Sequence, residues 1–323
     1  MGIAYAHGLY EPLPEGLFSV KWDWDPTLLF FLLLMGLYIR GIATRRIGVA
    51  RWQRVLFFVG VGLAGAALLP PVDPLSDRLF FAHMIQHMII VQIAIPLMLF
   101  GAPFYVVLRG MPRWMLRHVY RPALKSRLVR GLFRVWARPL VALAVFDVLF
   151  FAWHIPFLYN LALLNDAVHL VEHASFAVSA MFLWRNIIDP WPMRAPLAMP
   201  VRLLYLGAVM VSGVMLSAFL TFYDDVLYAY QGIPQPRWWD WGLLQDQRLG
   251  GLIMWVPGEF LNLIALSAVF LAWARRERAK EEREQAAEEA KARRVEDGSE
   301  AGGGEELDRS ASGPGPTSGA LAW

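Results

Sequence analysis

The chain has 323 residues, of which 57% are hydrophobic, 14% are aromatic and 18% are charged, and its formal net charge is +3. Since soluble domains carry about 25% charged residues, this composition indicates an integral membrane protein. The chain contains no cysteine, which excludes disulfides, thiolate metal sites and cysteine nucleophiles. Any chemistry must therefore use histidine, methionine, carboxylate or aromatic side chains.

A helix crosses the bilayer core with roughly 20 mostly apolar residues, and seven segments of the chain meet this condition. They are residues 26–44, 52–69, 79–100, 139–158, 167–188, 198–221 and 249–273. The first has no basic stretch before it and no small-residue cleavage site after it, so we expect a retained helix rather than a signal peptide. The expected fold is all-α, a polytopic membrane bundle of seven transmembrane helices over residues 26–273.

Lysine and arginine gather in alternate connections, and this asymmetry predicts the orientation. Arginines are dense after the first, third, fifth and seventh apolar segments, whereas the opposite ends are acidic or neutral. We therefore expect an extracytoplasmic N-terminal segment, residues 1–25, and a cytoplasmic C-terminus.

Two regions lie outside the predicted spans. Residues 109–138 are basic and amphipathic, which suits a helix on the anionic cytoplasmic leaflet, with a plain basic loop as the alternative. Residues 274–323 begin as a charged run typical of a solvated helix and end in a flexible segment that starts near residue 302.

Five histidines fall within the apolar segments. HMIQHM holds His83 and His87, FFAWHIP holds His154, and HLVEH holds His169 and His173. With a rise of about 1.5 Å per residue, all five are predicted in the outer half of the membrane on three consecutive helices. Each i,i+4 pair places both rings on one helix face, where they can share a metal ion. Ionisable groups in a bilayer are costly and usually functional, so we expect a metal or cofactor site. The alternative is a structural layer of hydrogen-bonded histidines.

The residue types around the histidines bear on the identity of the metal. Imidazole suits copper and zinc, and thioethers favour Cu(I), so copper is expected and zinc is the alternative. Met84 and Met88 are candidate soft ligands, although methionines often serve only as packing. Asp147, Glu172 and Glu259 are candidates to balance the charge of the metal or to orient a ligand. Their alternative role is structural pairing.

Two other hypotheses remain open at this stage. HLVEH matches H-x-x-E-H, a zinc-protease signature, and it keeps a less favoured intramembrane zinc hydrolase in view. A haem needs one imidazole from each of two facing helices, and the third and fifth segments offer both. The spacing of four residues disfavours a pair of stacked haems but allows a single one, as in a membrane redox protein.

Three stretches of this chain resemble the CtaG family, the assembly factors of caa(3)-type cytochrome c oxidase. They are FAHMIQHMIIVQIAIPLMLFGAPFYVVLRG, FAWHIPFLYNLALLNDAVHLVEHASFAVSAMFLWRNII and DQRLGGLIMWVPGEFL. The likeness runs from the third to the seventh segment, whereas the first two segments and the tail carry no matching motif. It implies a non-enzymatic, multi-pass protein of the bacterial plasma membrane that delivers or inserts copper during oxidase maturation. Its partners would be oxidase subunits and the lipid bilayer, without nucleic acid.

Carried over residue by residue, the resemblance implies a site made of His83, His87, His154, His169 and His173. We expect the two i,i+4 pairs to bind copper and His154 to complete or gate the site. Glu172 and Asp147 would tune it.

Overall fold

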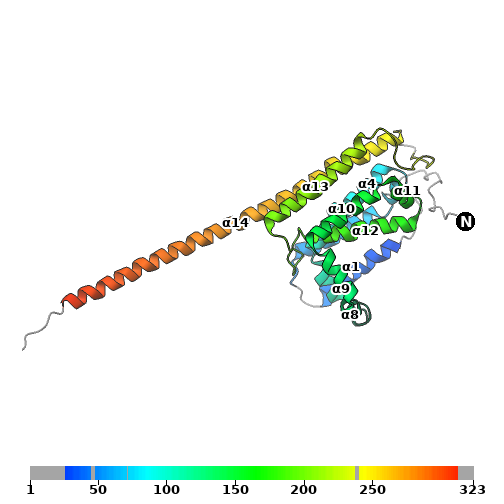
Figure 1. Ribbon diagram of the computed structural model, residues 1–323. Helices are drawn as coiled ribbons and strands as arrows, with labels where there is room; N and C mark the ends of the chain where they lie inside the picture. The colour runs from blue at the N-terminus through cyan, green and yellow to red at the C-terminus, as the bar shows by residue number, and fades with distance from the viewer. Residues whose placement is uncertain (1–25, 45–47, 71, 237–239, 312–323) are drawn as a thin grey trace, which may run out of the picture. The chain divides into compact units, whose positions relative to one another are not determined.

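The computed structural model describes residues 26–44, 48–70, 72–236 and 240–311, and within them every regular element is a helix (Figure 1). The predicted all-α class is therefore confirmed, while the N-terminal segment 1–25 lies outside the described residues. The helices are, in chain order, α1 (Pro26–Thr44), α2 (Arg51–Ala67), α3 (Val72–Ser76), α4 (Phe80–Met88), η1 (Ile89–Ala94), α5 (Ile95–Phe100), α6 (Pro103–Gly110), α7 (Arg113–Met115), η2 (Leu116–Tyr120), α8 (Arg121–Lys125), α9 (Arg127–Trp136), α10 (Pro139–Trp153), α11 (Pro156–Leu163), α12 (Asp166–Arg185), α13 (Met199–Phe222) and α14 (Leu243–Ala311).

Four helices are long and apolar enough to cross a membrane: the continuous helix from Phe80 to Phe100, α12, α13 and the span within α14. The bent pair of α9 and α10 makes a fifth if it is counted as one span. A helix also covers most of each of the other predicted segments, but the apolar part of α1 is shorter, and α2 has 17 residues. The chain is thus a multi-pass membrane protein by these candidate spans, and seven spans remain a prediction.

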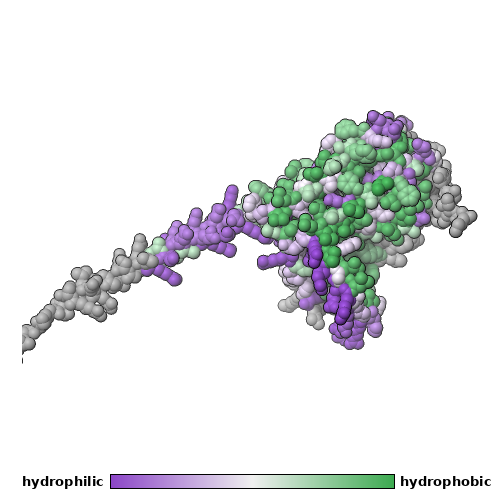
Figure 2. Space-filling model, in the orientation of Figure 1, coloured by the Kyte–Doolittle hydropathy of each residue, from purple (hydrophilic) through white to green (hydrophobic). Residues whose placement is uncertain are grey.

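The surface of the bundle formed by residues 26–269 is apolar. Large side chains such as Leu140, Leu204 and Phe157 are 78%, 76% and 74% exposed. Figure 2 shows hydrophobic residues over most of the visible face of the bundle, with hydrophilic residues gathered over α8 and α9. A water-soluble protein rarely exposes so much continuous apolar surface, so lipid is the natural solvent of this face.

Residues 270–323 form a second unit. The part of α14 in this unit carries the charged run, with exposed ion pairs from Lys280 to Glu277 and Glu284. The helix continues to Ala311, beyond the start of the flexible segment predicted near residue 302. Residues 312–323 lie outside the described part of the chain.

The helix from Phe80 to Phe100 contains a π-helical stretch, η1, in its centre. Pro96 is the second residue after its end, and a proline inside a helix removes one backbone N–H and crowds the carbonyl four residues earlier. A π-bulge is one way to absorb this disturbance. It rotates the residues after it relative to His83 and His87, which precede it.

The predicted helix 139–158 is not continuous, because α10 ends at Trp153 and a new helix, α11, begins at Pro156. Ile155 adopts an extended conformation, with φ −67° and ψ 128°. The residue before a proline is disfavoured in the helical region, so Pro156 breaks the helix and does not only kink it. His154 consequently lies at the helix end. Pro257 is accommodated inside α14 without a break.

The basic segment 109–138 is helical for most of its length, and α9 meets α10 at 84°. A helix perpendicular to a membrane span runs parallel to the bilayer plane. Leu128 and Leu132 on α9 are 71% and 55% exposed beside its arginines. The position of this segment at the membrane surface stays a prediction.

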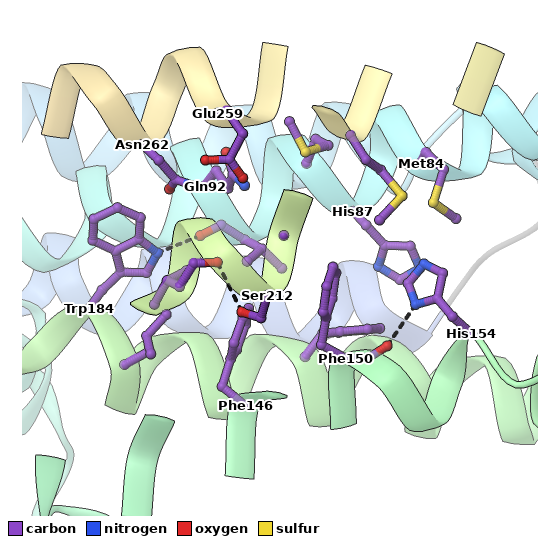
Figure 3. Close-up of a pocket in the computed structure, with 17 residues that line it drawn as sticks. Met84, His87, Gln92, Phe146, Phe150, His154, Trp184, Ser212, Glu259 and Asn262 are labelled. Carbon is purple, nitrogen blue, oxygen red and sulfur yellow. Dashed lines mark hydrogen bonds between the residues drawn. The ribbon is translucent and has the colours of Figure 1, made fainter. Parts of the chain in front are cut away.

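A partly open cavity of about 70 Å³ lies between α4, η1, α10, α12, α13 and α14 (Figure 3). Its wall is mostly aromatic and aliphatic, with a few polar side chains, among them His87, His154 and Glu259. Two of the site histidines predicted from the sequence, His87 and His154, therefore line this cavity, and the others lie beside it.

Candidate metal centre

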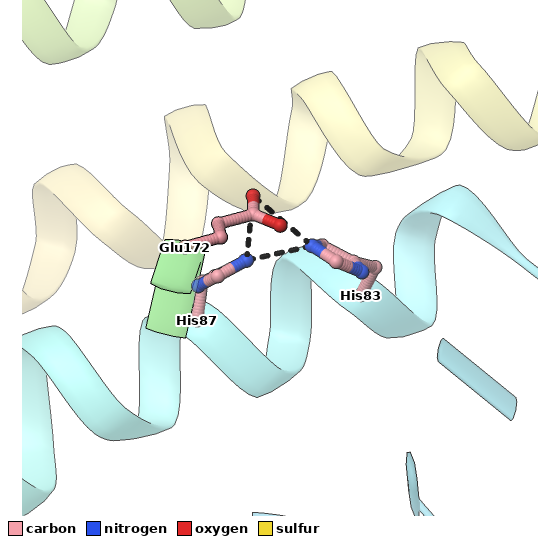
Figure 4. Close-up of side chains that lie close together, drawn as sticks. All are labelled: His83, His87 and Glu172. Carbon is pink, nitrogen blue, oxygen red and sulfur yellow. Dashed lines mark hydrogen bonds and ion pairs between the residues drawn. The ribbon is translucent and has the colours of Figure 1, made fainter. Parts of the chain in front are cut away.

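His83 and His87 lie on one face of α4, and their Nε2 atoms are 2.6 Å apart. The carboxylate of Glu172, on α12, lies opposite, with Oε1 at 3.6 Å from His83 Nε2 and 3.4 Å from His87 Nε2 (Figure 4). All three side chains are buried, and Glu172 is only 2% exposed. Their nitrogen and oxygen atoms are close enough for one metal ion to contact all three.

The second histidine pair lies directly beside the first. His169 and His173 have Nε2 atoms 2.8 Å apart on α12. The His169 ring stacks on that of His83 at a centroid distance of 5.3 Å, and the His173 ring stacks on that of His87 at 4.7 Å. Four imidazoles and one carboxylate are therefore packed in one cluster between two helices.

His154 joins this region from the end of α10. Its Nδ1 lies 2.7 Å from the carbonyl of Phe150 (Figure 3). Because a carbonyl can only accept, Nδ1 carries the proton in the neutral ring and Nε2 keeps a free lone pair. Tyr228 donates to the backbone carbonyl of His154 at 3.0 Å, which holds the helix end in place.

Several buried polar atoms of the cluster have no hydrogen-bond partner within the described residues: His87 Nδ1, His154 Nε2, Glu172 Oε2 and His173 Nδ1. Buried polar groups are normally paired, so this concentration points to something that binds here. The donor set of imidazoles and a carboxylate suits zinc or copper. The Nε2 separation of 2.6 Å in the first pair is shorter than the about 3.3 Å expected for two imidazoles on one tetrahedral ion. Small rotations of the two rings would bring the pair to that spacing.

The charge of Glu172 strengthens this interpretation. A carboxylate in a membrane span is costly unless a cation or a proton compensates it. Within the described residues, the groups nearest to its carboxylate are the imidazoles of His83 and His87. A bound metal cation, or a proton shared with one imidazole, would neutralise it.

The remaining predicted residues line or flank the cavity. Met84, Met88 and Glu259 line it beside His87 and His154. Asp147 accepts a hydrogen bond from Ser212 at 3.0 Å, and Ser212 lines the cavity. The structure therefore gathers all predicted site residues in one region, with Asp147 and Glu259 away from the histidine pairs and Glu172 among them.

Several supporting residues were not predicted. The Asp246 carboxylate on α14 accepts hydrogen bonds from the backbone N–H groups of Phe80 and Phe81 at 2.8 and 3.0 Å. Helix α4 has no side-chain cap of its own, and Asp246 supplies one. The Gln86 amide donates to the Ala67 carbonyl at 2.8 Å and so joins α4 to the end of α2. No local pattern in the sequence predicts these long-range contacts.

Three tyrosines also support the site. The Tyr159 ring lies 5.3 Å from the His83 ring, and its hydroxyl is 2.6 Å from that of Tyr230. Burial raises the pKa of the Tyr228 and Tyr230 hydroxyls well above their ordinary value. Both therefore remain protonated donors at neutral pH.

The geometry bears on the two alternative sites. A haem with two axial histidines lies between their imidazoles, whereas the rings here stack directly on each other at 4.7 and 5.3 Å and leave no gap for a macrocycle. In an H-x-x-E-H protease, the glutamate activates water beside its own motif histidines. Glu172 instead contacts His83 and His87, on the other helix. The cluster favours a bound metal ion over either alternative.

Comparisons with known proteins place this arrangement in a family. Searches of curated proteins and of solved structures find no match to the chain. The family model described as "Cytochrome c oxidase caa3 assembly factor (Caa3_CtaG)" matches residues 36–276, which include the whole histidine cluster and the cavity. The chain therefore belongs to the caa3-type cytochrome c oxidase assembly factor family.

Proposed function

We propose that this protein is a non-enzymatic copper carrier that acts in the assembly of a caa3-type cytochrome c oxidase. The imidazoles of His83, His87, His169 and His173 bind the ion, with Glu172 as a further ligand or charge partner. His154 completes or gates the site. The ion is cargo that the protein releases to an oxidase subunit.

The observation that carries this proposal is the packing of two i,i+4 histidine pairs around a buried carboxylate. The pairs stack at 4.7 and 5.3 Å, and two of their Nδ1 atoms have no partner among the described residues. Imidazole and carboxylate alone would suit zinc as well. Copper is favoured because methionine thioethers, which are ligands of Cu(I), line the adjoining cavity.

We further propose that the chain crosses the membrane seven times, with its N-terminus outside and its C-terminus in the cytoplasm. The arginine-rich connections support this orientation, and the arginines of α9 belong to one of these connections. The histidine cluster then lies in the outer half of the membrane. This is where an ion arriving from outside the cytoplasm would be received.

Release would follow from the chemistry of the ligands. Imidazole binds a metal only in its neutral form, so protonation lowers metal affinity. Docking of an oxidase subunit that admits water or protons to the cluster would therefore loosen the ion. The Glu172 carboxylate would then pair with the imidazolium that forms and balance its positive charge.

The test is metal analysis with a visible spectrum on protein purified in detergent. We expect about one copper ion in the imidazole site, no Soret band, and loss of this ion when His83 and His87 are both changed to alanine. The matched control is His118→Ala, because His118 is exposed and its Nδ1 contacts the nearby Trp114 carbonyl.

Two results would contradict the proposal. A Soret band that the double variant loses would identify a haem protein instead. Copper retained by the double variant at the native level would show that the cluster is not the binding site.

A further inference from the structure

The internal cavity combines three thioethers with two imidazoles. Met84 and Met88 reach it from α4, and Met254 reaches it from α14, beside His87 and His154. Met84 and Met254 are 2% and 8% exposed, so their sulfur atoms are shielded from solvent. Figure 3 shows Met84, His87 and His154 gathered in one part of this space.

Two glycines on α14 leave room for side chains of α4. A Cβ atom at Gly258 would lie 3.1 Å from Met88 Cε and 3.4 Å from its Sδ. One at Gly250 would collide with the Phe80 ring and would lie 3.3 Å from Met84 Cγ. A larger residue at Gly258 would therefore push the Met88 thioether aside, and one at Gly250 would first displace Phe80.

His154 supplies the second, independent observation. The Phe150 carbonyl occupies its Nδ1, and its Nε2 lone pair has no partner within the described part of the chain. The side chain is buried, at 9% exposure, and lines the cavity. A neutral imidazole held in this tautomer is ready to bind a Lewis acid and has no proton on Nε2 to donate.

From these observations we infer that the cavity is a second cargo site, specific for a soft monovalent ion such as Cu(I), made by Met84, Met88, Met254 and the Nε2 atom of His154. Thioether and imidazole are neutral, soft or borderline ligands that favour Cu(I) over Zn²⁺ or Cu²⁺. This inference rests on the proposed function, because it names the oxidation state in which the cargo is held. A carboxylate, Glu259, also lines the cavity but is not among these four ligands. In the other cluster the Glu172 carboxylate lies directly beside the imidazoles, and a carboxylate also accepts divalent ions.

The two sites adjoin at His87. This residue faces His83 and Glu172 through Nε2, and its side chain also lines the cavity. An ion can therefore pass from one site to the other by exchange of ligands at His87, with no change of oxidation state. The cavity therefore binds the ion next to the imidazole cluster before its release.

The experiment titrates detergent-purified protein with Ag⁺, an air-stable soft ion, and with Zn²⁺ as the borderline reference. The cavity variant carries Met84→Leu, Met88→Leu and Met254→Leu, because leucine nearly conserves the volume of methionine. Its matched control carries Met98→Leu, Met181→Leu and Met215→Leu, three methionines outside the cavity lining. A third variant, His83→Ala with Glu172→Gln, disables the imidazole cluster alone.

We expect the native protein and the matched control to bind about two Ag⁺ ions, and the cavity variant to bind about one while its Zn²⁺ binding is unchanged. The third variant should lose Zn²⁺ and keep the Ag⁺ ion of the cavity. His154→Ala should weaken that ion at least about tenfold. X-ray absorption of the native protein loaded with Cu(I) should show sulfur neighbours, a readout that needs no variant.

The outcomes separate this inference from the proposed function. If the cavity variant binds as much Ag⁺ as the native protein and Cu(I) has no sulfur neighbour, the methionines only pack and the second site does not exist. The imidazole site would then still stand on its own Zn²⁺ and copper binding. If the third variant binds like the native protein, the proposed function fails, whatever the cavity does.

Discussion

The carboxylate of Asp246 accepts a hydrogen bond from the backbone N–H of Phe80 at 2.8 Å and so ties the first turn of α14 to the first turn of α4. The side chain is 1% exposed, and it also accepts from the N–H of Phe81. His83 lies one turn further along α4. The capping carboxylate therefore holds the N-terminal turn of the helix that carries the first histidine pair.

Changing Asp246 to alanine should destabilise the protein by about 1–3 kcal/mol, because two buried N–H groups lose their acceptor. Metal affinity should fall as well, since the first turn of α4 loosens. Thermal unfolding in detergent, followed by circular dichroism, measures the first effect. Asp224→Asn is the control, because its ion pair with Arg248 is exposed and worth less than about 1 kcal/mol. Equal effects of the two changes would show that the cap is unimportant.

Changing Glu172 to glutamine should lower metal affinity by about 10–100-fold, which is the usual effect of losing a group that tunes a metal ligand. Glutamine keeps the shape of the side chain and removes the charge that lies 3.4 Å from His87. Competition against a chelator of known affinity measures the change. Glu172→Asp, which keeps the charge, should bind more tightly than the glutamine variant. An unchanged affinity in the glutamine variant would remove Glu172 from the site.

Asp77, which precedes the helix of the histidine pair, should make stability depend on pH. Burial raises the pKa of its carboxyl to about 8, and the nearby carboxylates of Asp73 and Asp166 add to this, while Arg78 opposes it. In the unfolded chain the pKa is about 3.9. The folded state therefore holds its proton more tightly, and stability is lost as the pH rises from about 4 to about 8.

Asp77→Asn removes the carboxyl whose ionisation destabilises the folded state at high pH. The variant should be more stable than the native protein by about 1 kcal/mol or more at pH 9, and the difference should vanish at pH 4. Unfolding temperatures of the native protein and the variant, measured between pH 4 and pH 9, test the direction of this difference. A variant that is less stable than the native protein at pH 9 would contradict the assignment.

Glycines between α1 and α6 should be intolerant of side chains. A Cβ at Gly110 would collide with the Leu37 carbonyl, and one at Gly41 would collide with the Val106 carbonyl. We expect Gly110→Ala to cost about 1–3 kcal/mol or more, because the backbones must separate. Gly62→Ala is the control in an open helical position and should be neutral or stabilising by up to about 1 kcal/mol. Thermal unfolding measures the stability of both variants. Equal stabilities would disprove the close approach of α1 and α6.

Local patterns in the sequence predicted much of this protein. Apolar runs identified helices in all seven places, and the i,i+4 spacing placed His83 with His87 and His169 with His173 on common faces. These properties depend on helical periodicity and on transfer from water to lipid, both of which act within a single segment. The break before Pro156 was not included in the predicted helix 139–158, because the sequence indicates that a proline disturbs a helix but not how far.

What the chain alone determined is that histidine pairs lie on helix faces within a membrane bundle. Only the tertiary structure decided which faces meet. The rotation of α12 about its axis turns Glu172 toward His83 and His87, and the contact with Phe150 selects the tautomer of His154. The cap from Asp246 to Phe80 joins residues far apart in the chain. Such pairings depend on the packing of whole helices against one another, and no local spacing of residues encodes the angle at which two helices face each other.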